Sequence, residues 1–171
     1  MTRQALKIKP EEVCLVPESR EEITTEGGLD VAVDVKRLKT VVRKLHSAKI
    51  EVSAFIDAEL AQVEAAHRIG AQTVELHTGA YANAITRGAR RKELARHGRA
   101  AAYAHEAGLR VNAGHGLHYG NVREYIEDVP HLHTLNIGHA IISRALFVGL
   151  ERAIREMVEL LGSREFAPNA D

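Results

Sequence analysis

The chain has 171 residues, 45% of them hydrophobic, and its 23 Lys and Arg residues balance its 23 Asp and Glu residues. This length and composition exclude a disordered chain and predict one globular domain. The balanced charge argues against binding of nucleic acid or an anionic membrane, and an aromatic content of 4% argues against a base-stacking surface.

The distribution of apolar residues and the cysteine content predict a cytoplasmic protein. Its first residues, MTRQALKIKPEE, lack the apolar core of a signal peptide, and the apolar stretch Ile141 to Leu150 is interrupted by Arg144 and too short to span a bilayer. The single cysteine, Cys14, lies in an apolar run, which indicates a buried thiol in a reducing compartment.

The first half also predicts alternating helices and strands. Residues 2–9 are typical of the end of a helix that Pro10 stops, and Val13 to Val16 is typical of a strand buried on both faces. The loop that follows reads SREEITTEGGLD, which favours a mobile functional loop over a plain solvated connection. Apolar residues at helical and strand spacing then predict helices at 33–47 and 60–69, each followed by a strand, at 52–56 and 73–76.

Two chemically active side chains stand at the end of the strand at 73–76. Glu75 and His77 are two residues apart and therefore share one face of the strand. Such a pair suits general acid–base or charge-stabilising work, and an ordinary structural hydrogen bond is an equal interpretation.

The motif VNAGHGL, residues 111–117, follows a long alanine-rich helix that Gly108 stops. Gly114 and Gly116 predict a turn that requires either close approach of the backbone or a positive φ. His115 at its tip is placed to give or take a proton near neutral pH, and the alternative is a histidine that only donates a hydrogen bond to a carbonyl.

A second corner of the same kind follows one unit later. The strand Thr134 to Ile137 leads into Gly138-His139-Ala140, which opens a helix extending to Leu161. Free backbone N–H groups at such a helix start suit phosphate or another anion, and His139 adds a donor. Two pairs of histidines have a spacing that would allow metal binding, His115 with His118 and His131 with His133. Both are weak candidates, because no carboxylate or cysteine completes a set of metal ligands.

Alternating strands and helices predict a parallel α/β fold with its site at the carboxyl ends of the strands. Both a (β/α)8 barrel and a doubly wound sheet meet this description. No GxGxxG follows the first strand, and the phosphate-type signature lies on the last strand, so the barrel is favoured.

Together, six motifs between about Pro10 and Leu161 resemble the pyridoxine 5'-phosphate synthase family of vitamin B6 biosynthesis: CLVPE, TTEGGLD, FID, VELHTG, VNAGHGL and LNIGHAII. The resemblance implies a TIM-barrel enzyme that condenses 3-amino-2-oxopropyl phosphate with 1-deoxy-D-xylulose 5-phosphate, releasing phosphate and water. It implies no metal or organic cofactor, and a cytoplasmic homo-oligomer, an octamer in the family.

The resemblance also assigns roles to individual residues. His115 would be the proton donor, and Glu75 would stabilise the transition state. Thr24 would bind the deoxyxylulose phosphate. The aminoacetone phosphate would be held by Gly116, Gly138 and His139.

Family members begin with three further βα units. The resemblance therefore predicts that residues 1–171 form a single truncated barrel domain of about five units, equivalent to strands 4 to 8, with a frayed tail at 162–171. We expect this chain alone to be inactive, because the earlier units carry two proton acceptors of the mechanism. The alternatives are an inactive anion-binding or self-associating fragment and another phosphosugar barrel enzyme, for which no strand offers a Schiff-base lysine.

Overall fold

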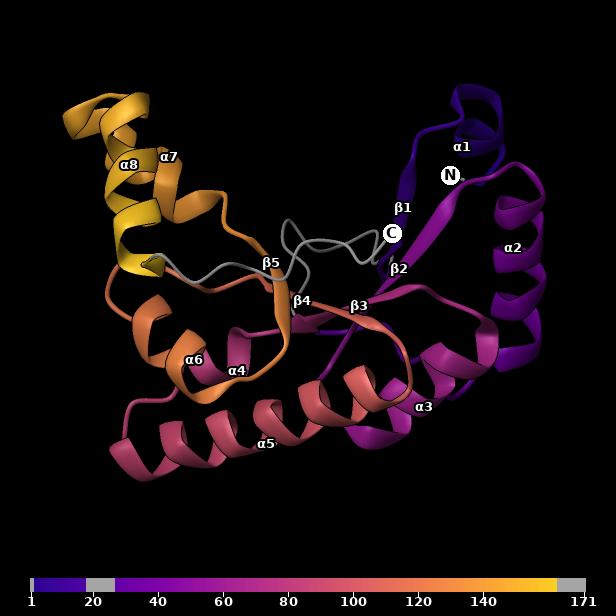
Figure 1. The fold of residues 1–171 in the computed structure, drawn as a ribbon, viewed down its shortest axis with the longest axis horizontal. Coiled ribbons are helices and arrows are strands. Elements are labelled where there is room, and N and C mark those ends of the chain that lie inside the picture. The colour runs from indigo at the N-terminus through magenta and orange to yellow at the C-terminus, as the bar shows by residue number, and fades with distance from the viewer. Residues whose placement is uncertain (1, 18–26, 163–171) are drawn as a thin grey trace.

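The computed structural model describes residues 2–17 and 27–162. Its centre is one parallel sheet in which the order of the strands, β1-β2-β3-β4-β5, follows the order of the chain (Figure 1). The strands are β1 (Glu12–Leu15), β2 (Glu51–Ile56), β3 (Thr73–His77), β4 (Arg110–Gly114) and β5 (Leu132–Asn136). This confirms the predicted parallel α/β architecture, and all carboxyl ends of the strands lie at one edge.

Helices separate the strands along the chain. They are α1 (Thr2–Ile8), α2 (Val35–Ser47), α3 (Leu60–Ile69), α4 (Gly79–Ala82), α5 (Arg87–Glu106), α6 (Val122–Asp128), α7 (His139–Val148) and α8 (Leu150–Leu161). Gly70 ends α3 with a φ of 89°, as a helix-stopping glycine does. Gly149, with a φ of 83°, divides the predicted last helix into α7 and α8. The predicted frayed tail lies outside the described residues from position 163 onward.

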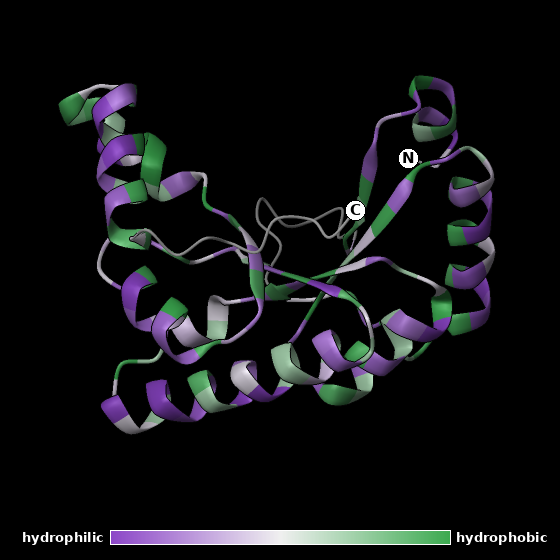
Figure 2. Cartoon of the chain, in the orientation of Figure 1, coloured by the Kyte–Doolittle hydropathy of each residue, from purple (hydrophilic) through white to green (hydrophobic). Residues whose placement is uncertain are grey.

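One face of the sheet is apolar and covered by helices. Val52, Ala54, Val74, Leu76 and Val111 are at most 1% exposed and belong to the main hydrophobic core. Side chains of α2, α3 and α5 pack on this face. Burial of each large apolar side chain stabilises the fold by about 1.5–3 kcal/mol. Figure 2 shows hydrophobic and hydrophilic residues alternating along these helices, as expected when one side of each is buried.

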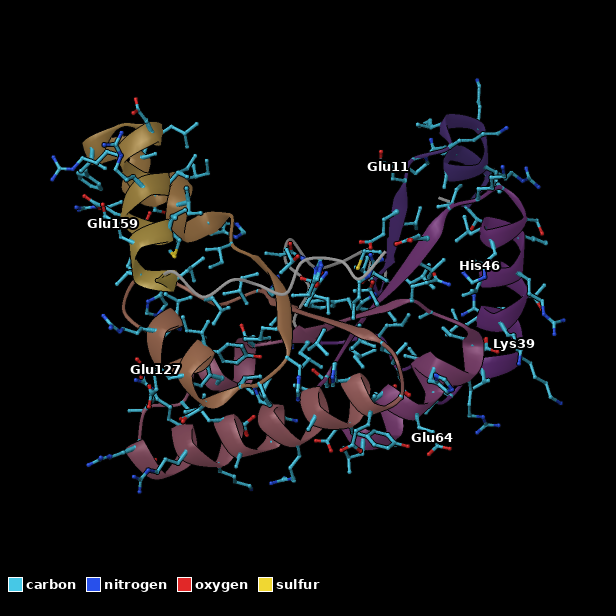
Figure 3. The ribbon with its side chains drawn as sticks, viewed as in Figure 1. Glu11, Lys39, His46, Glu64, Glu127 and Glu159 are labelled. Carbon is cyan, nitrogen blue, oxygen red and sulfur yellow. The ribbon has the colours of Figure 1, made fainter. Side chains whose placement is uncertain are left out.

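Charged residues of the helices point away from the sheet. Lys39 on α2, Glu64 on α3 and Glu127 on α6 are exposed and lie at the outside of the molecule (Figure 3). The other basic residues of α2 that are exposed in the same way are Lys36, Arg37, Arg43 and Lys44. Among the described residues, no helix is long and apolar enough to cross a membrane.

Within residues 2–17 and 27–162, β1 and β5 each pair on one side only, so the sheet has two open edges. The residues of β1 are alternately exposed and half-buried. The prediction that Val13 to Val16 is buried on both faces is therefore wrong, because only the face with Val13 and Leu15 packs against the core, while the face with Glu12 and Cys14 is exposed.

The hairpin of α7 and α8 carries an exposed apolar surface beside β5. Its large side chains are 44–85% exposed, and they are Ile142, Leu146, Phe147, Leu150, Ile154 and Val158. Apolar surface gathered in this way favours association with another protein surface.

We expect the 171-residue chain to self-associate through this hairpin. Sedimentation velocity should show a concentration-dependent rise in mass, and the double substitution Leu146→Glu with Phe147→Glu should shift the chain toward monomer. Ile85→Glu is the matched control, because Ile85 is 98% exposed and lies on a different part of the surface. A wild-type chain that stays monomeric at all concentrations would refute this expectation.

Candidate active site

The strand register brings the predicted polar residues together at the carboxyl edge of the sheet. Glu75 of β3 is paired in register with Asn112 of β4, and Gly114 is paired with both His77 of β3 and Asn136 of β5. Side chains at these positions share the face opposite the helix-covered core, since side chains alternate along a strand. This confirms that Glu75 and His77 lie on one face.

Glu75 is the central carboxylate of this face. The Asn136 amide donates to its Oε2 at 2.7 Å, and the Cys14 thiol lies 4.0 Å from the same oxygen. Desolvation by burial raises the pKa of Glu75, and the Asn136 hydrogen bond counteracts part of that effect. The carboxylate is thus half-buried and held by a neutral donor.

Cys14 differs from the sequence-based expectation. The residue is exposed, because its apolar neighbours Val13 and Leu15 turn toward the helices while Cys14 turns to the opposite face. Although the residue as a whole is exposed, protein atoms surround its thiol, and this desolvation, followed by the negative charge of Glu75, raises the pKa of the thiol to about 11. The thiol is therefore protonated at neutral pH and is a poor nucleophile.

His115 directly follows β4 and has a φ of 69°, a backbone conformation that few residues other than glycine adopt. Its ring lies edge-on to Phe55, with centroids 5.8 Å apart, and 5.3 Å from the ring of His77. Gly116 has a φ of 131°, and a side chain there would lie 2.9 Å from Ala82 Cβ. The predicted turn at this motif is confirmed.

His77 has a partner that the sequence did not reveal. Its Nδ1 lies 3.1 Å from Asp57 Oδ1, an oxygen that also accepts from the backbone N–H of Gly28 at 3.2 Å. Its Nε2 is buried and finds no hydrogen-bond partner among the described residues, and the missing side chain of Gly79 leaves room for it. Glu75 and His77 thus share a face and have separate partners, so they do not form a hydrogen-bonded pair.

Asp57 is a further candidate for the site, and none of the sequence motifs singled it out. Its position immediately after β2, at the same edge as the other polar residues, is the signal that could have found it. The Asp57 carboxylate contacts both Gly28, in the loop before α2, and His77, whose ring packs against that of His115.

The helix start after β5 is confirmed. Gly138 is the N-cap of α7, and apart from its neighbours in the chain no described residue lies within 4 Å of where its side chain would be, so the space there is open. His139 is the first residue of the helix and is exposed. The N-terminus of this ten-residue helix is suited to an anion by its free N–H groups and its dipole.

Thr24 lies outside the described residues. The histidines considered as metal ligands have other contacts. His118 accepts from the backbone N–H of Gly120 at 3.0 Å, and His131 stacks on His105 at a centroid distance of 3.9 Å. Across residues 2–17 and 27–162, no group of three His, Cys, Asp or Glu side chains is placed to hold a metal ion.

Similar solved structures define the class of the fold. A xylose isomerase domain protein from Planctomyces limnophilus matches with a TM-score of 0.59 and 16% identity, over 94% of this chain and 66% of its own. An aldolase from Escherichia coli K12 matches with a TM-score of 0.60 and 14% identity, over 97% and 65%. The chain is therefore an α/β protein with the strand and helix arrangement of TIM-barrel enzymes.

Sequence similarity identifies the family. The chain belongs to the family of the pyridoxal phosphate biosynthesis protein PdxJ, whose model matches residues 1–163. It is 56% identical over 153 residues to a pyridoxine 5'-phosphate synthase of Akkermansia muciniphila and 55% identical over 158 residues to one of Opitutus terrae. These matches cover 90% and 92% of this chain, which spans only 62% and 63% of the two relatives.

Proposed function

We propose that the protein carrying this chain is a pyridoxine 5'-phosphate synthase, which condenses 3-amino-2-oxopropyl phosphate with 1-deoxy-D-xylulose 5-phosphate to pyridoxine 5'-phosphate, phosphate and water. The observation that carries this proposal is the meeting of Glu75, His115 and the open start of α7 at one edge of the sheet, in a chain 56% identical to such a synthase. Acid, carboxylate and anion site are the parts that this condensation needs.

In the proposed mechanism His115 is the proton donor. The turn Gly114–Gly116 fixes its backbone, and Phe55 and His77 flank its ring, so the imidazole is held in one orientation at the mouth of the site. Closing the pyridine ring expels water, and a departing hydroxyl needs a proton from such a group.

Glu75 stabilises positive charge that develops on the amine-bearing intermediates. Because the carboxylate is half-buried, its field acts through a medium less polarisable than water. Gly116, Gly138 and His139 hold the aminoacetone phosphate through backbone N–H groups and an imidazole donor. The deoxyxylulose phosphate is bound with the help of Thr24, and the reaction uses no metal or organic cofactor.

We further propose that residues 1–171 are a single domain whose β1 to β5 correspond to strands 4 to 8 of a (β/α)8 barrel. The open edges at β1 and β5, and the larger size of the matched structures, support this. The protein works in the cytoplasm as a homo-oligomer. Its single cysteine supports the compartment, and the apolar surface on α7 and α8 supports the oligomer.

The test compares two purified proteins: the 171-residue chain, and a joined protein in which the N-terminal βα units that the resemblance implies, taken from the Akkermansia muciniphila relative, precede this chain. Each protein is incubated with the two substrates together, and the products are separated by chromatography. The joined protein should form pyridoxine 5'-phosphate, and the 171-residue chain should form none. A folded joined protein without turnover would overturn the proposed function. Turnover by the shorter chain would show that the five strands suffice.

A further inference from the structure

Glu75 and Asn136 make a hydrogen bond across an intervening strand. They belong to β3 and β5, which are separated by β4, yet Asn136 Nδ2 lies 2.7 Å from Glu75 Oε2. Because an ionised carboxylate only accepts, the amide meets it with its donor group. None of the residue roles that the family resemblance implies falls on Asn136.

The contact depends on a glycine between the two side chains. A Cβ at Gly114 would lie 2.6 Å from Glu75 Oε1 and 2.9 Å from the Asn136 carbonyl oxygen. Gly114 has an ordinary negative φ, so close approach is the constraint at this position. The carboxylate passes over β4 through the space that the glycine leaves.

We propose that Asn136 is a positioning residue for Glu75. Its amide fixes the orientation of the Glu75 carboxylate over Gly114 and keeps that carboxylate in its charged form. This rests on the proposed function, in which Glu75 stabilises positive charge. A charge-assisted hydrogen bond is both stronger and more directional than a neutral one, so losing it frees the carboxylate to rotate.

Apart from Asn136 and the weak thiol donor of Cys14, the groups around Glu75 either oppose its charged form or carry no charge. Burial raises the pKa of Glu75, and so does the negative charge of Glu12 on β1. The protonated thiol of Cys14, also on β1, is a weak donor at 4.0 Å, while Phe55 and Asn112, paired with Glu75 in register, carry no charge. Without the Asn136 donor, the pKa of Glu75 therefore rises further.

The first experiment measures Glu75 directly in the 171-residue chain. Side-chain carboxyl carbons of glutamate are labelled with ¹³C, the Glu75 signal is assigned with Glu75→Gln, and its pKa is read from an NMR titration. Asn136→Ala should raise the pKa of Glu75, and Asn136→Asp should raise it more because it adds a like charge. Asn83→Asp, which adds the same charge at the exposed end of α4, should leave it nearly unchanged. A Glu75 pKa unmoved by both Asn136 variants overturns the proposal.

The second experiment measures turnover in the joined protein. Asn136→Ala should lower kcat by about tenfold to a hundredfold, with little change in KM. The acid limb of the pH profile should move to higher pH, since activity is lost as pH falls through the pKa of Glu75. A lower kcat with an unmoved acid limb would mean a merely structural role and overturn the proposal. If the joined wild type has no turnover, the proposed function fails, while the NMR titration still decides whether Asn136 controls Glu75.

Discussion

Replacing His115 by asparagine in the joined protein should lower kcat by about 10²- to 10⁴-fold and leave KM nearly unchanged. Asparagine tolerates the left-handed backbone at this position better than most residues, so the fold should be kept. Its amide still makes hydrogen bonds and has no proton to transfer at working pH. Steady-state kinetics with both substrates, together with a thermal melt of each variant, provide the measurement.

His139→Asn is the matched comparison, because it makes the same change at the other Gly-His corner. If this side chain assists a backbone phosphate site, KM for the aminoacetone phosphate should rise more than kcat falls. Exchanged phenotypes would mean that the acid and the anchor are assigned to the wrong strands. Two fully active variants would return both histidines to structural roles.

A second large effect is expected at the base of the loop before α2. Gly28→Ala should lower the free energy of unfolding by about 3 kcal/mol in a urea titration. A methyl group there would overlap the backbone of Asp57 and lie 2.7 Å from Ile56 Cα, and backbone atoms of a central strand cannot move aside cheaply. The neighbouring hydrogen bond from Leu29 N to Phe55 O, 2.7 Å long, would be lost with the displaced segment.

Gly27→Ala is the control for this substitution. Among the described residues, the atom nearest to a methyl group at Gly27 is Asp57 Oδ2 at 4.0 Å, which is an ordinary contact. The free energy of unfolding of the Gly27→Ala variant should therefore match that of the wild type. Equal unfolding free energies for the two variants would show that the segment shifts without cost.

Features fixed by local sequence were predictable. The turn around His115 follows from two glycines flanking one residue, and the start of α7 follows from Gly138 after a short apolar strand. Helical spacing of apolar residues likewise located α2, whose Leu38, Val42 and Leu45 are buried. Each of these depends on residues close together in the chain.

Features that depend on which strands lie side by side were not predictable. The Asp57–His77 pair joins residues 20 positions apart, and the bond between Glu75 and Asn136 spans 61 positions. The exposure of Cys14 depends on which face of β1 the helices cover, which its apolar neighbours alone do not reveal. Hydropathy patterns carry no information about such long-range contacts.

The identity of strand order and chain order has a consequence for how the molecule assembles. Each strand pairs with the next strand along the chain, so ordering can spread from one unit to its neighbour without first joining distant parts of the chain. The inner strands β2, β3 and β4 are supported on both sides and carry much of the buried core. Amide protons should therefore exchange with solvent most slowly in these three strands and fastest at the edges of β1 and β5, as the chain opens from its ends inward.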